Sequence, residues 1–414
     1  MIKRARDLNQ ICADGLCVGC GICESLAGPA RVKMTMVEPG YLRPHTRQPI
    51  PPEIMQTILD VCPGVSIDGS CVEDTPLLDA VMGPGVSVWR GHASQNEVQF
   101  RAAAGGALTA LAMYLVDSGE VSFVLHVTAA QDAPMLTERK LSFDAGAVLD
   151  GAASRYGPAA PLLDVTQLLD RAEPFAFVGK PCDVAAIKNL ARHDQRAADL
   201  IKYTLTLSCA GVPALGFSSQ FLERHDIREQ DLSEFRYRGH GWPGPTYAKT
   251  NDGREASESY LQMWYPYSEK WKTQFRCKIC PDATGELADI TSVDDWPTGF
   301  PEKDEPVGRS LVVARTQAGD RLVRKAIEAG YLKMQPAEEE MHGLHQTQPH
   351  QVNKKRGILA RLLAMWVSGL PVPRFRNMRV LASAVTTHPV FHLRNFLGLR
   401  ARVRGHQNRE HVPR

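Results

Sequence analysis

The chain lacks the apolar segments that direct a protein into or across a membrane. Its first ten residues, MIKRARDLNQ, contain no apolar h-region, so no secretory signal is expected. No window reaches the ~18 uncharged apolar residues of a transmembrane helix, and the longest candidate, residues 357–370, contains Arg361. These absences predict a cytoplasmic protein. Disulfide bonds are then not expected, because cytosolic thiols are kept reduced, and clustered cysteines indicate metal or redox chemistry instead.

Acidic residues are almost absent from the C-terminal part of the chain. Between residues 354 and 414 the sequence has thirteen Lys or Arg and one acid, Glu410, although the net charge of the whole chain is only +2. The stretch RGILARLLAMWVSGL predicts a short helix that Pro371 and Pro373 end. We expect a solvated or partner-binding surface here, or else a helix that lies on an anionic membrane at its cytoplasmic face. Nucleic acid is not an expected partner, because the arginines are scattered and no nucleic-acid-binding fold is evident.

The rest of the sequence divides into a cysteine-rich segment, residues 1–75, and an alternation of helices and strands over residues 86–345, before the basic helix and tail of residues 346–414. The alternation predicts an α/β fold, α+β overall, with parallel strand pairs. Residues 39–53 are expected to form a loop and MGPG, residues 82–85, a linker. Strands are expected at 121–127, 174–179 and 200–208, and helices within 102–119, 183–191 and 213–224, the last with Pro213 in its first turn.

Three cysteines near the N-terminus have the spacing of an iron–sulfur site. Cys17, Cys20 and Cys23 are each separated by two residues in CVGCGIC. This spacing matches the opening of the ferredoxin pattern C-x2-C-x2-C-x3-C-P, whose thiolates hold a 4Fe–4S cluster. The glycines beside Cys20 let the backbone wrap closely around inorganic sulfur. Cys62, which is followed by Pro63, is the expected fourth ligand.

The fourth ligand and the metal of this group both have alternatives. Cys62 follows only after a long insertion, and Cys12 or Cys71 is an alternative ligand where it is not simply a buried small hydrophobe. Four thiolates also suit zinc. Zinc sites usually pair their cysteines two and two, whereas a triplet with a separate Cys-Pro does not have that arrangement. The pattern therefore favours a 4Fe–4S cluster.

A second group of cysteines is spread along the α/β part of the chain. Cys182 and Cys209 each follow an expected strand and precede an expected helix, and Cys277 and Cys280 form CKICPD. Loops at the carboxyl ends of parallel strands line the ligand crevice of such a sheet, and a helix N-terminus favours a thiolate. These four residues are expected to hold a second 4Fe–4S cluster. Inert buried thiols and a four-thiolate zinc site are the alternatives.

Several motifs in order along residues 15–335 resemble the beta subunits of coenzyme F420 hydrogenases and dehydrogenases and their iron–sulfur flavoprotein relatives, among them ferredoxin-dependent reductases of chlorophyll-type tetrapyrroles. The resemblance implies a ferredoxin-like 4Fe–4S domain over residues 1–75 and a mixed α/β domain over 86–345 that holds FAD and iron–sulfur. The motifs that carry it are CVGCGIC with Cys62-Pro63, AAAGGALTALAMYLVDSGEV, SRYGP, FVGKPCDVAAIKNL, SCAGVP, RYRGHGWPGP, RCKICPDATGELADI and GRSLVVARTQAGDRL.

The resemblance also implies a function. Such an iron–sulfur flavoprotein oxidoreductase passes single electrons between ferredoxin or a partner subunit, its 4Fe–4S clusters and FAD, in either direction. The flavin exchanges hydride with a small molecule, either coenzyme F420 or a reducible organic compound. A non-catalytic electron-transfer subunit of a larger complex and a zinc-stabilised binding protein are the alternatives. No residue is assigned to catalysis.

The resemblance places FAD against the helix entry that follows Ala102 and Ala103. The family usually has serines before its glycine pair, so this chain offers backbone contacts only. A second contact is expected just before Cys182, and further ones at family positions near the flavin. The expected FAD-binding residues are Ala104, Gly105, Gly106, Tyr156, Gly179, Lys180, Pro181, Arg238, Gly239 and Trp242.

Two other patterns are interpreted as structural. GHGWPG, residues 239–244, fits G-x-G-x-x-G but does not lead from a clear strand into a helix, and Pro243 disrupts it, so we interpret it as a loop. A group of aromatic residues precedes Cys277, and core packing is favoured for it over stacking on a planar ring. This group is Tyr260, Trp264, Tyr265 and Tyr267.

Overall fold

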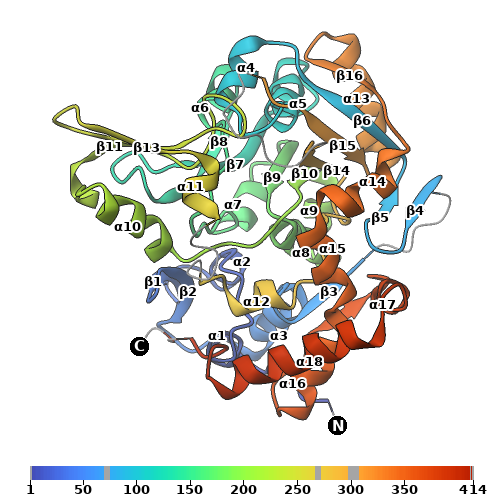
Figure 1. Cartoon of the computed structure of the whole chain (residues 1–414). Helices are drawn as coiled ribbons and strands as arrows, with labels where there is room; N and C mark the ends of the chain where they lie inside the picture. The colour runs from blue at the N-terminus through green and yellow to red at the C-terminus, as the bar shows by residue number, and fades with distance from the viewer. Residues whose placement is uncertain (1, 70–74, 266–271, 297–306, 411, 413–414) are drawn as a thin grey trace.

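The computed structural model describes residues 2–69, 75–265, 272–296, 307–410 and 412 (Figure 1). Its centre is a mixed sheet of eight strands in the order β16-β6-β15-β14-β10-β9-β7-β8. This sheet confirms the predicted mixed α/β fold. Its strands are β6 (Ser87–Ala93), β7 (Phe123–Ala129), β8 (Thr137–Ser142), β9 (Phe175–Gly179), β10 (Ile201–Leu207), β14 (Ile290–Asp294), β15 (Ser310–Ala314) and β16 (Leu332–Pro336).

The four central strands are parallel, and helices cover both of their faces. β14, β10, β9 and β7 run parallel, whereas β15, β6, β16 and β8 each pair antiparallel with their neighbour. Alternate side chains of β9 enter different cores: Phe175 and Phe177 pack with α8 (Pro181–Leu190), and Ala176 packs with α5 (Ala107–Asp117). Burial on both faces explains why FAFVG is apolar throughout.

The chain places the ends of five strands along one edge of this sheet. Gly179, Leu207 and Asp294 end the parallel strands β9, β10 and β14. Asp294 lies opposite Ser310, the first residue of β15, and Ser310 lies opposite Gly91 near the end of β6. The carboxyl edge of a parallel sheet is where α/β proteins build their ligand sites.

A smaller layer packs around its own hydrophobic core beside this edge. Antiparallel strands β11 (Leu232–Arg236), β12 (Thr246–Thr250) and β13 (Glu255–Glu258) form a three-stranded sheet. Helices α10 (Leu215–Arg224) and α11 (Tyr260–Trp264) complete the layer. GHGWPG joins β11 to β12 as the predicted loop, with no helix after it.

The cysteine-rich N-terminal segment and the basic C-terminal segment pack against each other, as the blue and red ribbons of Figure 1 show. β17 (Arg374–Arg376) pairs in parallel with β3 (Ser66–Asp68), although about 300 residues separate them. Ala364, Met365 and Leu399 of the C-terminal helices share one core with residues of the N-terminal helices. The N-terminal segment also contains α1 (Leu8–Ala13), α2 (Ile22–Ala27), β1 (Val32–Val37), β2 (Tyr41–Thr46) and α3 (Pro52–Val61).

Four local predictions differ from the structure. The loop expected at 39–53 contains β2, which pairs with β1, and the linker expected at 82–85 contains the buried β5 (Gly83–Gly85), paired with β4 (Leu77–Asp79). The helix expected from Pro213 begins at Leu215, since Ala214 is its extended N-cap. The basic helix ends at Val367, before either proline, and Gly369 follows in the left-handed conformation.

The remaining elements connect these parts. No helix among the described residues is both long enough and apolar enough to cross a bilayer. The connecting helices are α4 (Asn96–Arg101), α6 (Ala145–Asp150), α7 (Val165–Leu169), α9 (Gln195–Leu200), the 3-10 helix η1 (Glu229–Asp231), α12 (Phe275–Lys278), α13 (Gln317–Glu328), α14 (Glu340–Thr347), α15 (Pro349–Arg356), α16 (Ile358–Val367), α17 (Val380–Ala384) and α18 (Pro389–Arg404).

Candidate functional site

The first three cysteines lie on a tight buried loop between α1 and α2. Gly19 and Gly21, on either side of Cys20, have φ values of +75° and +88°, a conformation that residues with a side chain rarely adopt. The loop turns so sharply that the Gly19 N–H points at the Cys17 sulfur, 3.4 Å away. Cys17, Cys20 and Cys23 are all buried. Backbone donors aimed at sulfur and buried thiols are features of an iron–sulfur loop.

Cys62 joins this group from the end of α3. Burial raises the pKa of the Cys23 thiol, and the neighbouring Cys17 and Cys62 thiols raise it further. Burial likewise raises the pKa of Cys62 to about 11, while the backbone N–H groups of Gly64 and Val65 act in the opposite direction by hydrogen bonding to its sulfur. The structure therefore brings together the four predicted ligands of the first group.

Cys12 lies beside the first group. It is fully buried in α1, and its hydrogen bond to Cys17 is the main cause that lowers the pKa of the Cys17 thiol. Cys71, the other unassigned cysteine, lies outside the described residues.

The second group of four thiols converges at the carboxyl edge of the sheet. Cys182 lies in the first turn of α8, and Cys209 is the second residue after β10. Cys277 lies in α12, and Cys280 lies in the turn after it. Burial raises the pKa of Cys182, and Cys209 and Cys280 are among the neighbours that add to this effect. Burial also raises the pKa of Cys209, and its neighbours Cys277 and Cys280 raise it further. The structure thus brings together all four predicted ligands of the second group.

The spacing of the thiols bears on the choice of metal. Four sulfurs around one zinc ion lie about 3.8 Å apart, because each Zn–S bond is about 2.3 Å long. Among the described residues, three or more His, Cys, Asp or Glu ligand atoms lie within 4.8 Å of one another only at Asp79, His342 and His345. No three of the described thiols are therefore as close as a zinc site requires, whereas a cluster with its own inorganic sulfur needs a wider cage.

Arg276 lies between the two cysteine groups. Its buried guanidinium donates one hydrogen bond to the Pro63 carbonyl, 2.7 Å away, and another to the Ile279 carbonyl, 3.2 Å away. Pro63 follows Cys62 of the first group, and Ile279 precedes Cys280 of the second. The two groups are therefore adjacent and share one buried cation. Sequence reasoning missed Arg276, although it begins RCKICPD.

Two lysines supply further positive charge to the second group. Lys180 forms an ion pair with Asp183, 2.7 Å away, and the Lys180 ammonium lowers the pKa that burial raises at Cys182. Lys354, from the C-terminal segment, is buried and donates to the Ala210 carbonyl next to Cys209. Buried cations next to these sulfurs favour ligands that carry negative charge. No local pattern marks Lys354 as a site residue, because 144 positions separate it from Ala210.

Arg238 is the centre of the second part of the site. Its buried guanidinium donates to both carboxylate oxygens of Asp294, at 3.0 and 3.1 Å, and to the Pro243 carbonyl at 2.8 Å. It also donates to the Ala103 carbonyl and, over 3.4 Å, to the Tyr156 hydroxyl. Arg238 thereby joins the end of β14 to the turn before α5 and to the loop after β11.

Aromatic rings surround this guanidinium. It lies 5.1 Å from the centre of the Tyr260 ring and 5.8 Å from that of Trp296. Trp242 stacks on Trp296 with ring centres 4.8 Å apart and an angle of 25° between the planes. The Trp242 indole N–H is buried and has no hydrogen-bond partner among the described residues. A buried donor without a partner is costly in a finished core and indicates a position where a ligand binds.

The glycine turn before α5 packs tightly onto the same sheet edge. The Gly105 N–H donates to the Ser310 hydroxyl, 3.0 Å away, and a Cβ at Gly105 would lie within 2.9 Å of the Gly91 carbonyl. Gly106 then begins α5 as its N-cap. The Gly105 N–H is therefore already used, and backbone donation to an anion is left to the first turn of α5.

The ten predicted FAD contacts fall into two places along the edge. Gly179, Lys180 and Pro181 lie at the start of α8, beside Cys182, and Lys180 is already paired with Asp183. The others gather around Arg238, and they are Ala104, Gly105, Gly106, Tyr156, Gly239 and Trp242.

Gln348 bridges the ends of β10 and β14, and sequence reasoning missed it. Its carbonyl accepts from the Ser208 hydroxyl and its amide donates to the Asp294 carbonyl, each over 3.3 Å. Of the predicted aromatic group, Tyr260 and Trp264 pack in the smaller layer, Tyr265 is exposed, and Tyr267 lies outside the described residues.

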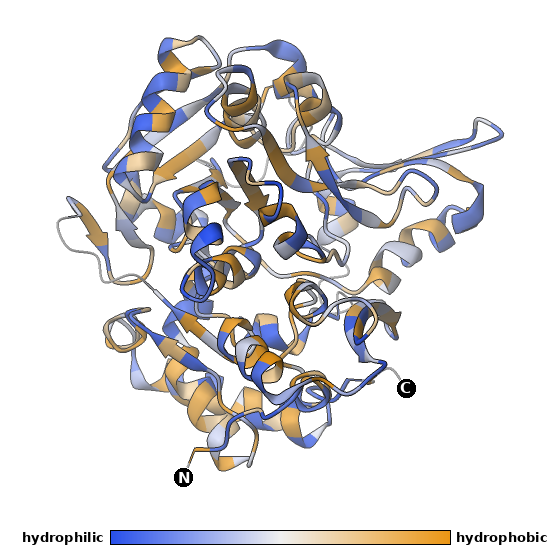
Figure 2. Ribbon diagram, turned by 180° about the vertical axis from the view of Figure 1, so that it is seen from behind, coloured by the Kyte–Doolittle hydropathy of each residue, from blue (hydrophilic) through white to orange (hydrophobic). Residues whose placement is uncertain are grey.

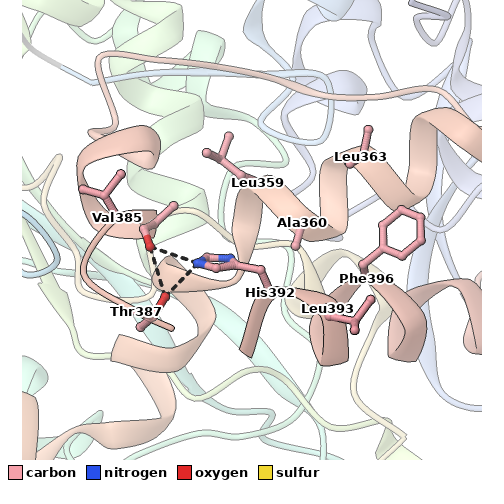
Figure 3. Close-up of a pocket in the computed structure, with 9 residues that line it drawn as sticks. Leu359, Ala360, Leu363, Val385, Thr387, His392, Leu393 and Phe396 are labelled. Atoms are coloured by element: carbon pink, nitrogen blue, oxygen red, sulfur yellow. Dashed lines mark hydrogen bonds between the residues drawn. The ribbon is translucent and has the colours of Figure 1, made fainter. Parts of the chain in front are cut away.

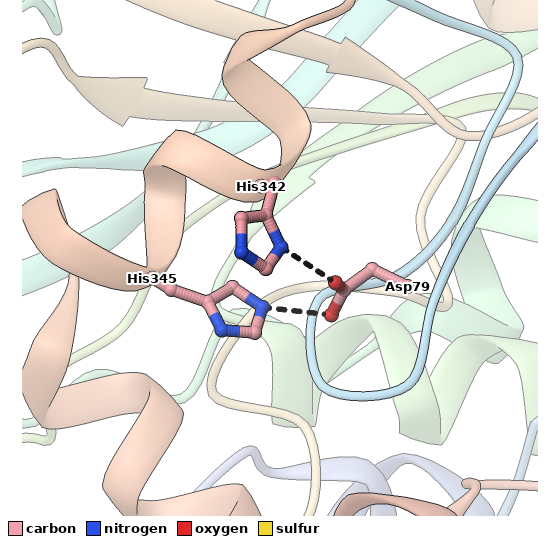
Figure 4. Close-up of side chains that lie close together, drawn as sticks. All are labelled: Asp79, His342 and His345. Atoms are coloured by element: carbon pink, nitrogen blue, oxygen red, sulfur yellow. Dashed lines mark hydrogen bonds and ion pairs between the residues drawn. The ribbon is translucent and has the colours of Figure 1, made fainter. Parts of the chain in front are cut away.

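Asp79, His342 and His345 form a cluster away from this edge (Figure 4). Arg356 donates to Nδ1 of His345, so the His345 proton is on Nε2, which donates to Asp79 over 2.9 Å. The same Asp79 oxygen accepts the backbone N–H groups that follow β4. These hydrogen bonds use the atoms that a metal would need, so we interpret the cluster as a tie between β4 and α14.

Comparison with known proteins follows the same division of the chain. Residues 88–167 match the model of the coenzyme F420 hydrogenase/dehydrogenase beta subunit N-terminus, and residues 172–340 match that of its C-terminus. The coenzyme F420 hydrogenase subunit beta of Methanococcus voltae is 27% identical over 293 residues, covering 68% of this chain and 95% of the relative. The F420-dependent formate dehydrogenase subunit beta of Methanocaldococcus jannaschii is 26% identical over 258 residues, covering 59% and 61%.

A solved structure has the same fold. A chain of the F420-reducing [NiFe] hydrogenase complex from Methanosarcina barkeri superposes with a TM-score of 0.57 and 19% identity, covering 72% of this chain and 98% of that one. The family models leave residues 1–87 and 341–414 outside their matches. The two matched regions together span the sheet, the second cysteine group and the surroundings of Arg238. The chain belongs to the family of coenzyme F420 hydrogenase and dehydrogenase beta subunits.

Proposed function

We propose that this chain is the redox subunit of an oxidoreductase complex, which exchanges electrons between ferredoxin or a partner subunit and a small-molecule hydride carrier. The observation that carries the proposal is the adjacency of two groups of four thiols, joined by the buried Arg276. A metal site with a purely structural role needs no second metal site beside it. Electron transfer, in contrast, requires two redox centres close to each other. The named relatives are subunits of hydrogenases and a formate dehydrogenase that use coenzyme F420, which supports that coenzyme or a reducible organic compound as the carrier.

The residues fit two 4Fe–4S clusters and FAD. The first group, Cys17, Cys20, Cys23 and Cys62, and the second, Cys182, Cys209, Cys277 and Cys280, would each hold one cluster. When bound, such clusters supply single-electron transfer and FAD supplies hydride exchange. The chain itself contributes burial, N–H donors to sulfur, and the cations that balance the charge of the thiolates.

The surroundings of Arg238 fit FAD better than the start of α8 does. Arg238 offers a buried cation, and Trp242 offers an indole N–H that lacks a partner among the described residues. The pairing with Asp294 holds the guanidinium plane in place. Lys180 at the other candidate position is likewise paired with a carboxylate, that of Asp183, so the Trp242 N–H is the feature that distinguishes the Arg238 position. We therefore assign the flavin to the edge between β14 and α5, with Gly179, Lys180 and Pro181 belonging to the second cluster.

Anaerobic purification with iron and sulfide reconstitution tests the cofactors. We expect roughly eight irons per chain, one FAD, and flavin absorption bands over a broad cluster shoulder. The reduced protein is then mixed separately with coenzyme F420, oxidised nicotinamide cofactors, ferredoxin and tetrapyrroles, and we expect reoxidation by coenzyme F420 or an organic ring compound. A colourless protein that contains zinc would refute the redox assignment.

Substitution of Arg238 tests the flavin position separately. Arg238→Lys keeps the charge but removes the planar pair of donors to Asp294, so we expect loss of most bound FAD with iron content unchanged. Arg228→Lys is the matched control, because Arg228 also donates to both oxygens of one carboxylate, that of Asp231, but does so on the exposed η1 turn before β11. Equal FAD content in the two variants would remove the flavin from Arg238 while leaving the cluster assignment intact.

A further inference from the structure

The C-terminal helices expose an unusual number of large apolar side chains. α17 and α18 both pack against α16. Leu381 of α17 is 69% exposed, and Val385, just after this helix, is 75% exposed. The orange segments at the base of the molecule in Figure 2 include these helices. The other large apolar side chains exposed on this surface are Leu363, Trp366, Val367, Val390, Leu393 and Leu397.

A hollow lies on each side of the ridge formed by Leu381 and Val385. The first is a groove of about 580 Å³ between α16 and α18, lined by apolar residues such as Leu363 and Phe396 (Figure 3). His392 fixes its shape, because its Nε2 atom lies 2.8 Å from the Thr387 hydroxyl and 2.9 Å from the Ala384 carbonyl. The second hollow lies between Leu381 and Phe375. Leu381 and Val385 therefore stand at the rim where the two hollows meet, with most of each side chain exposed.

The charges around this surface have one sign. Arg394 is exposed between Leu393 and Leu397 on α18, and Arg400 lies 5.7 Å from the Phe396 ring at the end of the groove. Glu410 is the only acid from residue 346 onward, and it is paired with Arg43 of the N-terminal segment. No acidic side chain of the described C-terminal residues is thus available to balance the arginines on this surface.

We propose that the surface formed by α16, α17 and α18 docks on an anionic lipid bilayer. The ridge residues Leu381 and Val385 enter the boundary between headgroups and acyl chains, and Arg394 and Arg400 bind lipid phosphates. A partner helix would need a concave slot with the apolar anchors inside it. Protruding apolar side chains beside Arg394 and Arg400, in a segment whose one acid is already paired, suit a negatively charged lipid surface instead. This inference concerns where the protein sits and does not depend on the proposed function.

Vesicle sedimentation of the full chain tests the proposal. We expect binding to vesicles of phosphatidylcholine with 30% phosphatidylglycerol, as a composition of roughly physiological negative charge, and little binding to phosphatidylcholine alone. Leu381→Asp with Val385→Asp should lower the partition coefficient at least about tenfold, because two apolar side chains no longer leave water. Phe143→Asp is the control, since Phe143 is 51% exposed just after the edge strand β8, outside the C-terminal helices, and should bind as the wild type does.

Two further measurements keep the outcome decisive. Arg394→Gln with Arg400→Gln should remove the preference for the anionic vesicles, with an unchanged midpoint of thermal unfolding as the check on folding. Trp366, half exposed beside the groove, should be quenched by brominated lipid, and this quenching should disappear in Trp366→Phe. Absence of vesicle binding by the wild type would overturn the proposal. A wild-type dimer that the variant Leu381→Asp with Val385→Asp no longer forms would also overturn it, because the surface would then bind a second copy of the chain. Capture of an acidic protein without vesicles, lost in the same variant, would overturn it too.

Discussion

Cys12 and Cys62 differ in their surroundings in a way that separates a neighbour from a ligand. Cys12 lies inside α1 with its thiol hydrogen-bonded to Cys17. Cys62 ends α3 and receives the N–H groups of Gly64 and Val65 on its sulfur. Donors of this kind stabilise a thiolate that carries charge. The position of the sulfur and its donors therefore support Cys62 as the fourth ligand.

Substituting each of these cysteines by serine measures the difference. Cys62→Ser should reduce the iron content from about eight to about four per chain, because the first cluster loses a ligand. Cys12→Ser should retain about eight, since it removes only a neighbouring thiol. Iron and sulfide analysis after anaerobic reconstitution gives the result. Equal iron loss in both variants, or loss only in Cys12→Ser, would contradict the assignment of Cys62.

His126 gives the stability of the chain a dependence on pH. Burial lowers the pKa of His126 to about 4, while its Nε2 atom lies 2.7 Å from the Ser142 hydroxyl. The unfolded chain therefore takes up this proton near pH 6.5 and the folded chain only near pH 4. The stability tied to neutral His126 is complete above about pH 6.5 and is lost as the pH falls toward 4, by about 2 kcal/mol at pH 5.

Thermal unfolding checks this dependence. The midpoint of the wild type should fall between pH 7 and pH 5 by more than that of His126→Gln, whose amide keeps a hydrogen bond to Ser142 but does not titrate. Identical shifts in the two proteins would show that other groups cause the loss.

At the scale of elements, a buried ion pair attaches α15 to the loop that follows the second cysteine group. Lys355 and Glu286 are both completely buried and in contact, and Arg379 approaches the other carboxylate oxygen of Glu286. Lys355→Met should destabilise the fold by about 3–5 kcal/mol, because it leaves part of a buried charge unpaired. Lys249→Met, which removes the exposed pair with Glu255, should cost less than about 1 kcal/mol. Comparable losses of thermal stability in the two variants would contradict this account.

Elements with a strong local pattern were predictable, and those built from distant contacts were not. FAFVG and the helix after it have apolar residues in runs that burial on two faces requires, so β9 and α8 agree with the prediction within two residues. YLRPHT and GPG contain proline and glycine, which weaken a strand pattern, and only their pairing with β1 and β4 makes them strands.

The same distinction holds for the candidate site. Each predicted cysteine stands in a recognisable spacing or at the end of a predicted strand, and the structure brings both groups of four together. Arg276, Gln348 and Lys354 reach the site through contacts between distant segments, and no local pattern marks such residues. Lys180 is the opposite case, because its motif can be recognised in the sequence but its ion pair with Asp183 appears only in the structure. This ion pair leaves the ammonium less available to a ligand.

At the scale of the whole molecule, the C-terminal segment is a structural part of the N-terminal one. Removal of residues 346–414 would expose Leu16, Ile58 and Val65, which share a core with the C-terminal helices. We expect the shortened chain to lose the iron of the first cysteine group and to aggregate, because that apolar surface returns to water. Co-expression of residues 346–414 as a separate chain should restore part of the iron. A soluble shortened chain with about eight irons would contradict this prediction.

The pairing of β3 with β17 also sets an order of events during synthesis. Roughly 300 residues lie between the two strands, and at about 5–20 residues per second a ribosome needs some 15–60 s to make them, by an order-of-magnitude estimate. CVGCGIC and Cys62 therefore leave the ribosome long before the strand that closes over them exists. During this interval the first four thiols are accessible to the machinery that delivers iron and sulfide, and also to oxidants. A segment that is made much later then packs against the segment that holds these cysteines.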